Sequence, residues 1–127
     1  QFSKKDDIQK AYQLKSITDV WAAYGYLNIP ISGYTDGKVE VSSWKDWNKL
    51  FQAYIDRVEG DKVYVKVANM TDGNYLEEKV YSFPFNVEML KHEYGLTPVD
   101  GKFTFVVSSA NDEDKIKAVE FTYDITK

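Results

Sequence analysis

The sequence contains no cysteine and a single histidine, His92. Without thiols the chain forms no disulfide and no thiolate metal site, and it has no cysteine nucleophile. A structural zinc site is excluded too, because such sites are built from cysteine and histidine ligands. His92 lies in "LKHEYG", near the end of an expected short helix, where a cationic side chain simply favours the helix terminus. We therefore expect no metal, no cofactor and no catalytic residue.

Long apolar runs and an excess of positive charge are also lacking. No run approaches the roughly 18–20 residues of a membrane helix. The net charge is −4 and the pI is about 5.0, which weighs against a nucleic-acid partner, because phosphate binding requires clustered Lys and Arg. The phosphate-binding and nucleophile motifs G-x-x-x-x-G-K-[ST], G-x-G-x-x-G and G-x-S-x-G are absent. A protein or a glycan is the expected partner, without a membrane-spanning segment.

The chain of 127 residues fits one domain, residues 1–127. It starts with "QFSKKDD", and we interpret residues 1–7 as a flexible tether left after removal of a signal or a lipid anchor. The alternative is a boundary inside a larger protein. A cysteine-free chain suits the cytosol and equally an exported bacterial protein that needs no disulfides. Our expectation is an extracytoplasmic protein: secreted, periplasmic or surface-anchored as a lipoprotein.

Three similar pieces open three expected strands. They are "DGKVEV" at 36–41, "GDKVYVKV" at 60–67 and "DGKFTFVV" at 100–107. Their spacing is unequal, whereas a true repeat keeps its period. Each piece combines a Gly/Asp turn with the first alternation of a strand, so we interpret them as strand starts.

The clearest hairpin joins strands 52–58 and 62–69 through Glu59-Gly60-Asp61. In this register the apolar side chains share one face, with the pairs Ile55–Val65, Arg57–Val63 and Ala53–Val67. Further strands are expected around the Asp36-Gly37 turn, at 75–83, at 103–107 and at 119–125.

Helical spacing or capping residues mark four other segments. They are 4–13, a short helix from Ser16 that carries Val20, Trp21 and Tyr24, a helix at 43–51, and a helix at 87–94 capped by Asn86 and ended by Gly95. A strand from Ile17 to Tyr26 is the alternative for the second segment.

The predicted fold is α+β, with a mainly antiparallel sheet of five to seven strands and two or three short helices. From residue 52 onward the order is strand, strand, strand, helix, strand, strand, which is the element order of an OB-like, partly open barrel. The order alone is shared by many α+β domains.

The aromatic content of 16%, with ten tyrosines, gives the one candidate site. Tyr54, Asp56, Tyr64 and Lys66 share the polar face of the expected hairpin, and Tyr81 extends this face on the next strand. Exposed tyrosines between charges can stack sugar rings, bases or a partner's peptide. In the alternative interpretation a helix covers the tyrosines and they are core.

The predicted function is a non-catalytic binding or interaction domain of an exported bacterial protein. A carbohydrate-binding module that uses the exposed tyrosine face is the first alternative, and a small enzyme with an acid/base carboxylate is the second.

Four local features carry smaller predictions. Asp112-Glu113-Asp114 is expected to be a solvated acidic turn, with a hard-cation site as the alternative. Asn69-Met70-Thr71 is a glycosylation sequon, meaningful only for a eukaryotic secretory route. Asp72-Gly73 is expected to place Gly73 at positive φ, and Trp47 and Phe51 are expected to be buried.

Overall fold

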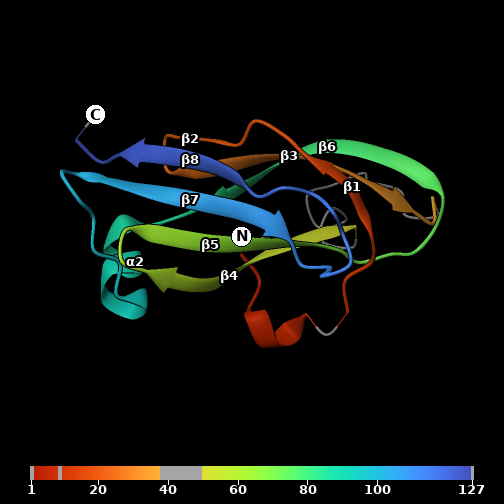
Figure 1. Ribbon diagram of the computed structural model, residues 1–127, viewed down its shortest axis with the longest axis horizontal. Coiled ribbons are helices and arrows are strands. Elements are labelled where there is room, and N and C mark those ends of the chain that lie inside the picture. The colour runs from red at the N-terminus through yellow and green to blue at the C-terminus, as the bar shows by residue number, and fades with distance from the viewer. Residues whose placement is uncertain (1, 9, 38–49, 127) are drawn as a thin grey trace.

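The computed structural model of the chain describes residues 2–8, 10–37 and 50–126 (Figure 1). Over these residues the protein is mostly β, with eight strands, one α-helix and one 3-10 helix. The helices are η1 (Lys5–Asp7) and α2 (Val87–Tyr94). The strands are β1 (Leu14–Ile17), β2 (Trp21–Ala23), β3 (Tyr26–Thr35), β4 (Phe51–Glu59), β5 (Lys62–Asn69), β6 (Tyr75–Pro84), β7 (Lys102–Ser109) and β8 (Val119–Asp124).

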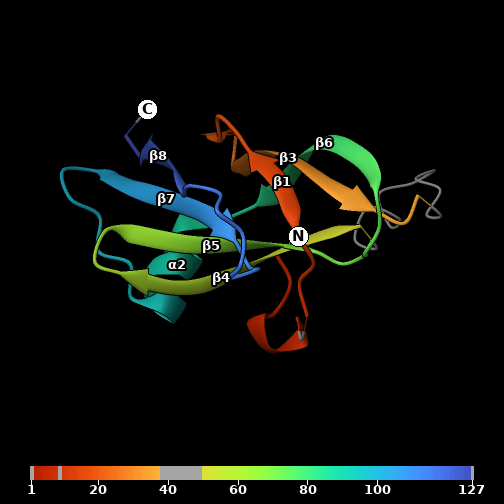
Figure 2. The same cartoon turned by 45° about the vertical axis from the view of Figure 1, so that its right-hand side comes forward.

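The first sheet is built around β3. β6 pairs with β3 along its whole length, from Tyr26 opposite Pro84 to Thr35 opposite Tyr75. β2 and β1 share the other edge of β3, and Figure 2 shows β1 beside β3. All pairs in this sheet are antiparallel. We call it the β3 sheet.

The second sheet has the order β4-β5-β7-β8. β4–β5 and β7–β8 are antiparallel pairs, whereas β5 and β7 run parallel. Between β5 and β7 the chain crosses to the β3 sheet as β6 and returns through α2. The OB-like arrangement is not confirmed, because β6, which would be the third strand of that barrel, pairs with β3 instead. The two sheets form no closed barrel.

The core lies between the two sheets. Along much of β3, β4 and β5, buried residues alternate with less buried ones, as expected for sheets with one buried face. The fully buried residues include Leu27 and Ile29 of β3, Val63, Val65 and Val67 of β5, and Phe103 and Val107 of β7. The alternation predicted for β7 is therefore confirmed.

The helix predicted from Ser16 to Tyr24 is wrong. The segment forms β1 and β2, and the chain then turns at Tyr24 (φ 53) and Gly25 (φ 78) into β3. The Ser16 hydroxyl bonds to the Ser32 hydroxyl across the β1–β3 pair and caps no helix. Pairing with the long β3 strand outweighs the helical spacing of the apolar residues.

Among the described residues before β1 only η1 is helical, so the helix expected at 4–13 is also wrong. Residues 2–7 lie against the edge of β4 and are not detached from the sheet. The Ser3 N–H donates to the Ala53 carbonyl at 2.7 Å, and the Phe2 ring stacks on Phe83 with centroids 5.1 Å apart. The backbone N–H and C=O groups on the open edge of a strand need hydrogen-bond partners, and the N-terminal segment supplies one to β4.

Residues 43–49 of the predicted helix 43–51, including Trp47, lie outside the described residues, as does the strand expected at 39–41. Leu50 is in a turn and Phe51 begins β4. The Phe51 side chain is buried as predicted, although it belongs to a strand.

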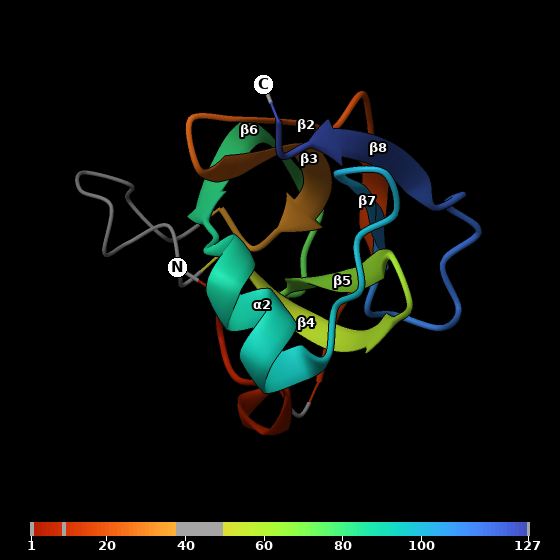
Figure 3. The same cartoon turned by 90° about the vertical axis from the view of Figure 1, so that its left-hand side faces the viewer.

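The helix predicted at 87–94 is confirmed as α2, which lies at the end of the molecule that carries the β4–β5 turn (Figure 3). The Asn86 side chain accepts a hydrogen bond from the Met89 N–H at 3.0 Å, and Gly95 ends the helix at φ 76. No helix within the described ranges has the length and apolar character needed to cross a membrane.

Gly73 is required for a reason other than the predicted one. It does not adopt a positive φ. The backbone of Thr35 approaches it so closely that an added Cβ would lie 2.0 Å from the Thr35 carbonyl oxygen. Packing of the segment before β6 against the end of β3 therefore excludes a side chain at this position.

Candidate functional site

The β4–β5 hairpin brings four of the five predicted site residues together. Tyr54, Asp56, Tyr64 and Lys66 are half-buried on its outer face, and Tyr54 lies directly opposite Lys66. Ile55 and Ala53 point inward, as the alternation predicts. We call these four residues the hairpin face.

The predicted register needs one correction. Ile55 pairs with Val65 as expected, but Arg57 pairs with Tyr64 and not with Val63. The turn is one residue shorter than predicted, with Glu59 opposite Lys62, and a bulge at Asp56 takes up the extra residue of β4. The bulge places Arg57 beside Tyr64.

Asp56 of the hairpin face is paired with two neighbouring cations. The Asp56 carboxylate accepts from Lys5 Nζ at 2.6 Å and from Arg57 at 2.7 Å, and Arg57 also contacts Glu59 at 3.0 Å. Partial burial alone would raise the pKa of Asp56, but these hydrogen bonds outweigh it and hold that pKa below its usual value. Burial, followed by the charge of Asp56, raises the pKa of the Tyr54 hydroxyl.

The Arg57 guanidinium covers the Tyr64 ring, with 3.9 Å from its carbon to the ring centroid. This cation–π contact occupies one face of the ring that would otherwise stack against a ligand. Neighbouring residues therefore neutralise Asp56 and cover part of the Tyr64 ring of the hairpin face.

Tyr81 does not belong to this face, and its prediction as an exposed site residue is wrong. It lies on β6 in the β3 sheet with only 5% of its surface exposed. Its ring packs edge-on against Phe51, with ring centroids 5.5 Å apart, and is stacked with the Phe83 ring at a centroid distance of 6.3 Å. Burial raises the pKa of its hydroxyl. Tyr81 is thus a core residue between the sheets.

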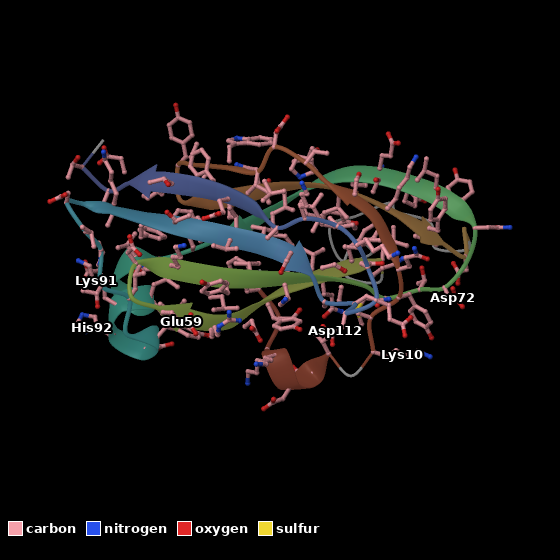
Figure 4. All side chains as sticks on the ribbon, in the orientation of Figure 1. Lys10, Glu59, Asp72, Lys91, His92 and Asp112 are labelled. Atoms are coloured by element: carbon pink, nitrogen blue, oxygen red, sulfur yellow. The ribbon has the colours of Figure 1, made fainter. Side chains whose placement is uncertain are left out.

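The other polar candidates have structural partners. His92 is exposed on α2 and its Nε2 lies 3.5 Å from Glu88 one turn earlier; Figure 4 shows it at one end of the molecule, far from Asp112. The Asp114 carboxylate accepts from the Ser109 hydroxyl at 2.6 Å and from the Leu14 N–H at 3.0 Å. Within 2–8, 10–37 and 50–126, no three acidic or histidine side chains converge on a metal position.

Sequence reasoning missed a second aromatic cluster at the β2–β3 turn. Trp21, Tyr24 and Tyr26 are 41%, 97% and 47% exposed, and we call them the aromatic patch. They border a shallow hollow of about 430 Å³, which Ala23, Asn28 and Ser82 also line. The incorrect helix prediction assigned Trp21 and Tyr24 to a short helix, so their place beside the β2–β3 turn was not predicted.

Two polar side chains complete this hollow. Asn28 stands between Trp21 on β2 and Ser82 on β6, because both are its direct cross-strand partners. The Ser82 hydroxyl donates to the Asn28 side-chain oxygen at 2.6 Å. The Asn28 amide nitrogen is 3.5 Å from the Tyr26 carbonyl, a long and weak contact. That amide and the Ser82 oxygen remain available to a bound molecule.

The outer face of the β3 sheet continues from the aromatic patch toward a second hollow of about 400 Å³. Along β3 the outward positions alternate with buried ones. Pro30 faces Val80, and Ser32, bonded to Ser16, faces Glu78. The period-2 pattern in "YLNIPISGY" at 26–34 is the signal that identifies this face.

A larger cleft of about 800 Å³ lies between the N-terminal segment, β4 and α2. Phe2, Ile55, Phe85 and Met89 supply its apolar lining, and the Lys5–Asp56 ion pair lies at its side. Residues 2–6 themselves form one wall of this cleft.

No family model, no curated protein and no solved structure matches this chain.

Proposed function

We propose that the protein is a non-catalytic binding domain of an exported bacterial protein and that its ligand binds at the aromatic patch. The observation that carries this proposal is Tyr24, which is almost fully exposed at a positive φ. A left-handed conformation costs a residue other than glycine about 1 kcal/mol or more, and Asn, Asp or Gly usually occupies such turn positions. An exposed tyrosine here contributes no packing that offsets this strain, which favours a role in binding.

The neighbours of Tyr24 support the same surface. Trp21 and Tyr26 leave close to half of their area open to solvent. Tryptophan and tyrosine are enriched in binding surfaces, because they present a large apolar area together with a hydrogen-bonding group. The hydrogen-bonding groups of Asn28 and Ser82 lie in the same hollow.

The non-catalytic part of the proposal rests on the carboxylates. General acid/base catalysis requires two convergent titratable groups beside a substrate pocket. Asp56 is held in ion pairs with Lys5 and Arg57, and Asp114 accepts structural hydrogen bonds. Export is part of the proposal, and the cysteine-free composition is compatible with it, as it is with the cytosol.

The hairpin face is the weaker candidate for a carbohydrate-binding surface. Arg57 covers the Tyr64 ring, and Asp56 is already neutralised by two cations. A ligand would have to displace these contacts before it could stack on Tyr64.

Three variants test the proposal: Trp21→Ala and Tyr24→Asn in the aromatic patch, and Tyr64→Ala as the matched control on the hairpin face. Arrays of glycans and peptides are probed with the wild type and with each variant. We expect ligands of the wild type to lose at least tenfold in affinity with either patch variant, because central aromatic residues dominate binding energies. Tyr64→Ala should bind like the wild type. Ligands that depend on Tyr64 and not on Trp21 would contradict the proposal.

Tyr24→Asn also gives a test that needs no ligand. Asn adopts the left-handed conformation more readily than Tyr, so thermal melting of this variant should occur at the wild-type temperature or above it. A clear drop in melting temperature would show that Tyr24 stabilises the fold, and the argument from strain would fail.

A further inference from the structure

We propose that the ligand is a neutral oligosaccharide that lies along β3 and β6, from the aromatic patch to the hollow beside Glu78. This inference rests on the proposed function, because it names the ligand of the same surface. It differs from the predicted carbohydrate site, which was the hairpin face on the other sheet.

The aromatic end matches the two kinds of surface that a sugar ring presents. The C–H faces of a pyranose are apolar and stack on aromatic rings, whereas its hydroxyl groups need partners that both donate and accept. Trp21 and Tyr26 offer exposed ring surface on neighbouring strands. The Asn28 amide and the Ser82 hydroxyl, in the same hollow, offer the donor and the acceptor.

The hollow at the aromatic patch is uncharged and favours a neutral ligand there, whereas Glu78 and Lys79 line the second hollow. None of the residues that line the hollow at the aromatic patch is a Lys, Arg, Asp or Glu. An ionic ligand would lose hydration there without gaining an opposite charge. Beside the hairpin face, in contrast, Asp56 contacts Lys5 and Arg57, and Arg57 contacts Glu59.

The length of the face favours an oligomer. From Tyr26 to Ser32 the outward positions of β3 extend over roughly 20 Å at the usual rise of a strand, which is longer than a single sugar unit. At the far end the second hollow is lined by the Ser16–Ser32 hydroxyl pair, of which Ser32 is only 7% exposed, and by Glu78 and Lys79. Hydroxyls and one carboxylate are suitable partners for further sugar hydroxyls. Pro30 and Val80 form the apolar stretch between the two hollows.

Two other occupants are less suitable. A proline-rich peptide also stacks on aromatic residues, but it is poor in hydrogen-bond donors and would supply few of them to the Glu78 carboxylate. A second copy of the chain would take the Glu78 carboxylate and the Ser16–Ser32 hydroxyls out of water, and burial of such groups without partners costs free energy. Both are outcomes of the test.

The experiment is calorimetric titration of the full chain with neutral saccharides. The probes are the monosaccharides glucose, xylose and N-acetylglucosamine and a hexasaccharide of each. Maltohexaose is a second glucose hexasaccharide, and a decaproline peptide is the peptide probe. We expect at least one hexasaccharide to bind, at least tenfold more tightly than its monosaccharide. Trp21→Ala should lower its affinity at least tenfold. Glu78→Ala should weaken binding of the hexasaccharide severalfold and leave the affinity for its monosaccharide unchanged, and Tyr64→Ala should change neither affinity.

Each contrary result identifies what is wrong. If no saccharide binds, the ligand class is overturned. If decaproline binds and Trp21→Ala abolishes this binding, the aromatic patch is confirmed as the binding surface and the oligosaccharide is refuted as its ligand. If a saccharide binds equally well to Trp21→Ala, both the surface and the inference fail. A hexasaccharide that binds no better than its monosaccharide overturns the extended site, and a dimer in sedimentation equilibrium that Trp21→Ala dissociates identifies a second copy as the occupant.

Discussion

Removal of the side-chain amide of Asn69 is expected to destabilise the fold by about 3 kcal/mol. Asn69 ends β5 and is fully buried. Its amide nitrogen donates to the Gln13 carbonyl at 2.9 Å and to the Tyr34 carbonyl at 2.8 Å, and its side-chain oxygen accepts from the Thr71 N–H at 3.1 Å. One side chain thus ties the start of β1 and the end of β3 to the β5 strand of the opposite sheet.

The magnitude follows from these three bonds. A typical hydrogen bond contributes about 1 kcal/mol net, and a buried partner left unpaired adds to the loss. Asn69→Ala removes all three bonds, so we expect a loss of about 3 kcal/mol in the free energy of unfolding. Asn69→Asp keeps the shape and the acceptor for Thr71, but its second oxygen faces two carbonyl oxygens and its charge is buried. Asn69→Asp should therefore be the more damaging change.

Urea denaturation of both variants measures these losses, and Thr71→Ala is the control. The Thr71 hydroxyl is buried and has no hydrogen-bond partner among the residues that the structure describes, so its removal should change the stability by only about 0.5 kcal/mol. A loss below about 1 kcal/mol for Asn69→Ala, or a smaller loss for Asn69→Asp than for Asn69→Ala, would refute the reasoning. The same bonds show that the folded protein offers no free Asn69 amide for glycosylation of the sequon.

Three further predictions follow from close contacts. Gly73→Ala should lower the melting temperature, because its Cβ would meet the Thr35 carbonyl; an unchanged melting curve would show that this segment shifts freely. Tyr64→Ala should lower the free energy of unfolding by about 1 kcal/mol or less, the size of a half-exposed cation–π contact, whereas a loss of several kcal/mol in urea would make Tyr64 a core residue. The pKa of Asp56 is lowered in the folded state. Its ion pairs therefore stabilise the protein fully at pH values above the unfolded-state pKa of about 4. This contribution is lost as the pH falls through the folded-state pKa. The stability difference between wild type and Asp56→Asn should accordingly be constant from pH 5 to 7 and shrink below pH 4, and a difference independent of pH over this range would count against the ion pairs.

The parts of the fold with strong local signals could be predicted from the sequence. Asn86 and Gly95 mark both ends of α2 by their own chemistry, and the turn around Gly60 fixes the β4–β5 hairpin. The β2–β3 turn could not be predicted, because Tyr24 is not a residue that usually adopts a positive φ. Val20 and Tyr24 are also spaced as on a helix, so the local pattern favoured the wrong element.

The sequence predicted some residues of the candidate site and not others, depending on whether their neighbours in space are also neighbours in sequence. Alternation correctly assigned Tyr54 and Tyr64 to one outer face, because both strands of that hairpin are neighbours in sequence. Tyr81 required knowledge of the sheet to which β6 belongs, and that depends on its pairing with β3, a long-range contact that no local pattern encodes. The aromatic patch was missed because its strands were mistaken for a helix.

The pairing of β3 with β6 also has a consequence for how fast the protein folds. Tyr26 meets Pro84 and Thr35 meets Tyr75, so this pair encloses the chain that forms β4 and β5. Proteins dominated by such distant pairings fold over milliseconds to seconds, because the entropy of closing a long loop must be overcome before the contacts form. Stopped-flow refolding should therefore be slow for a chain of this size, and substitutions within β6 should alter the refolding rate if the β3–β6 pair forms before the barrier is crossed.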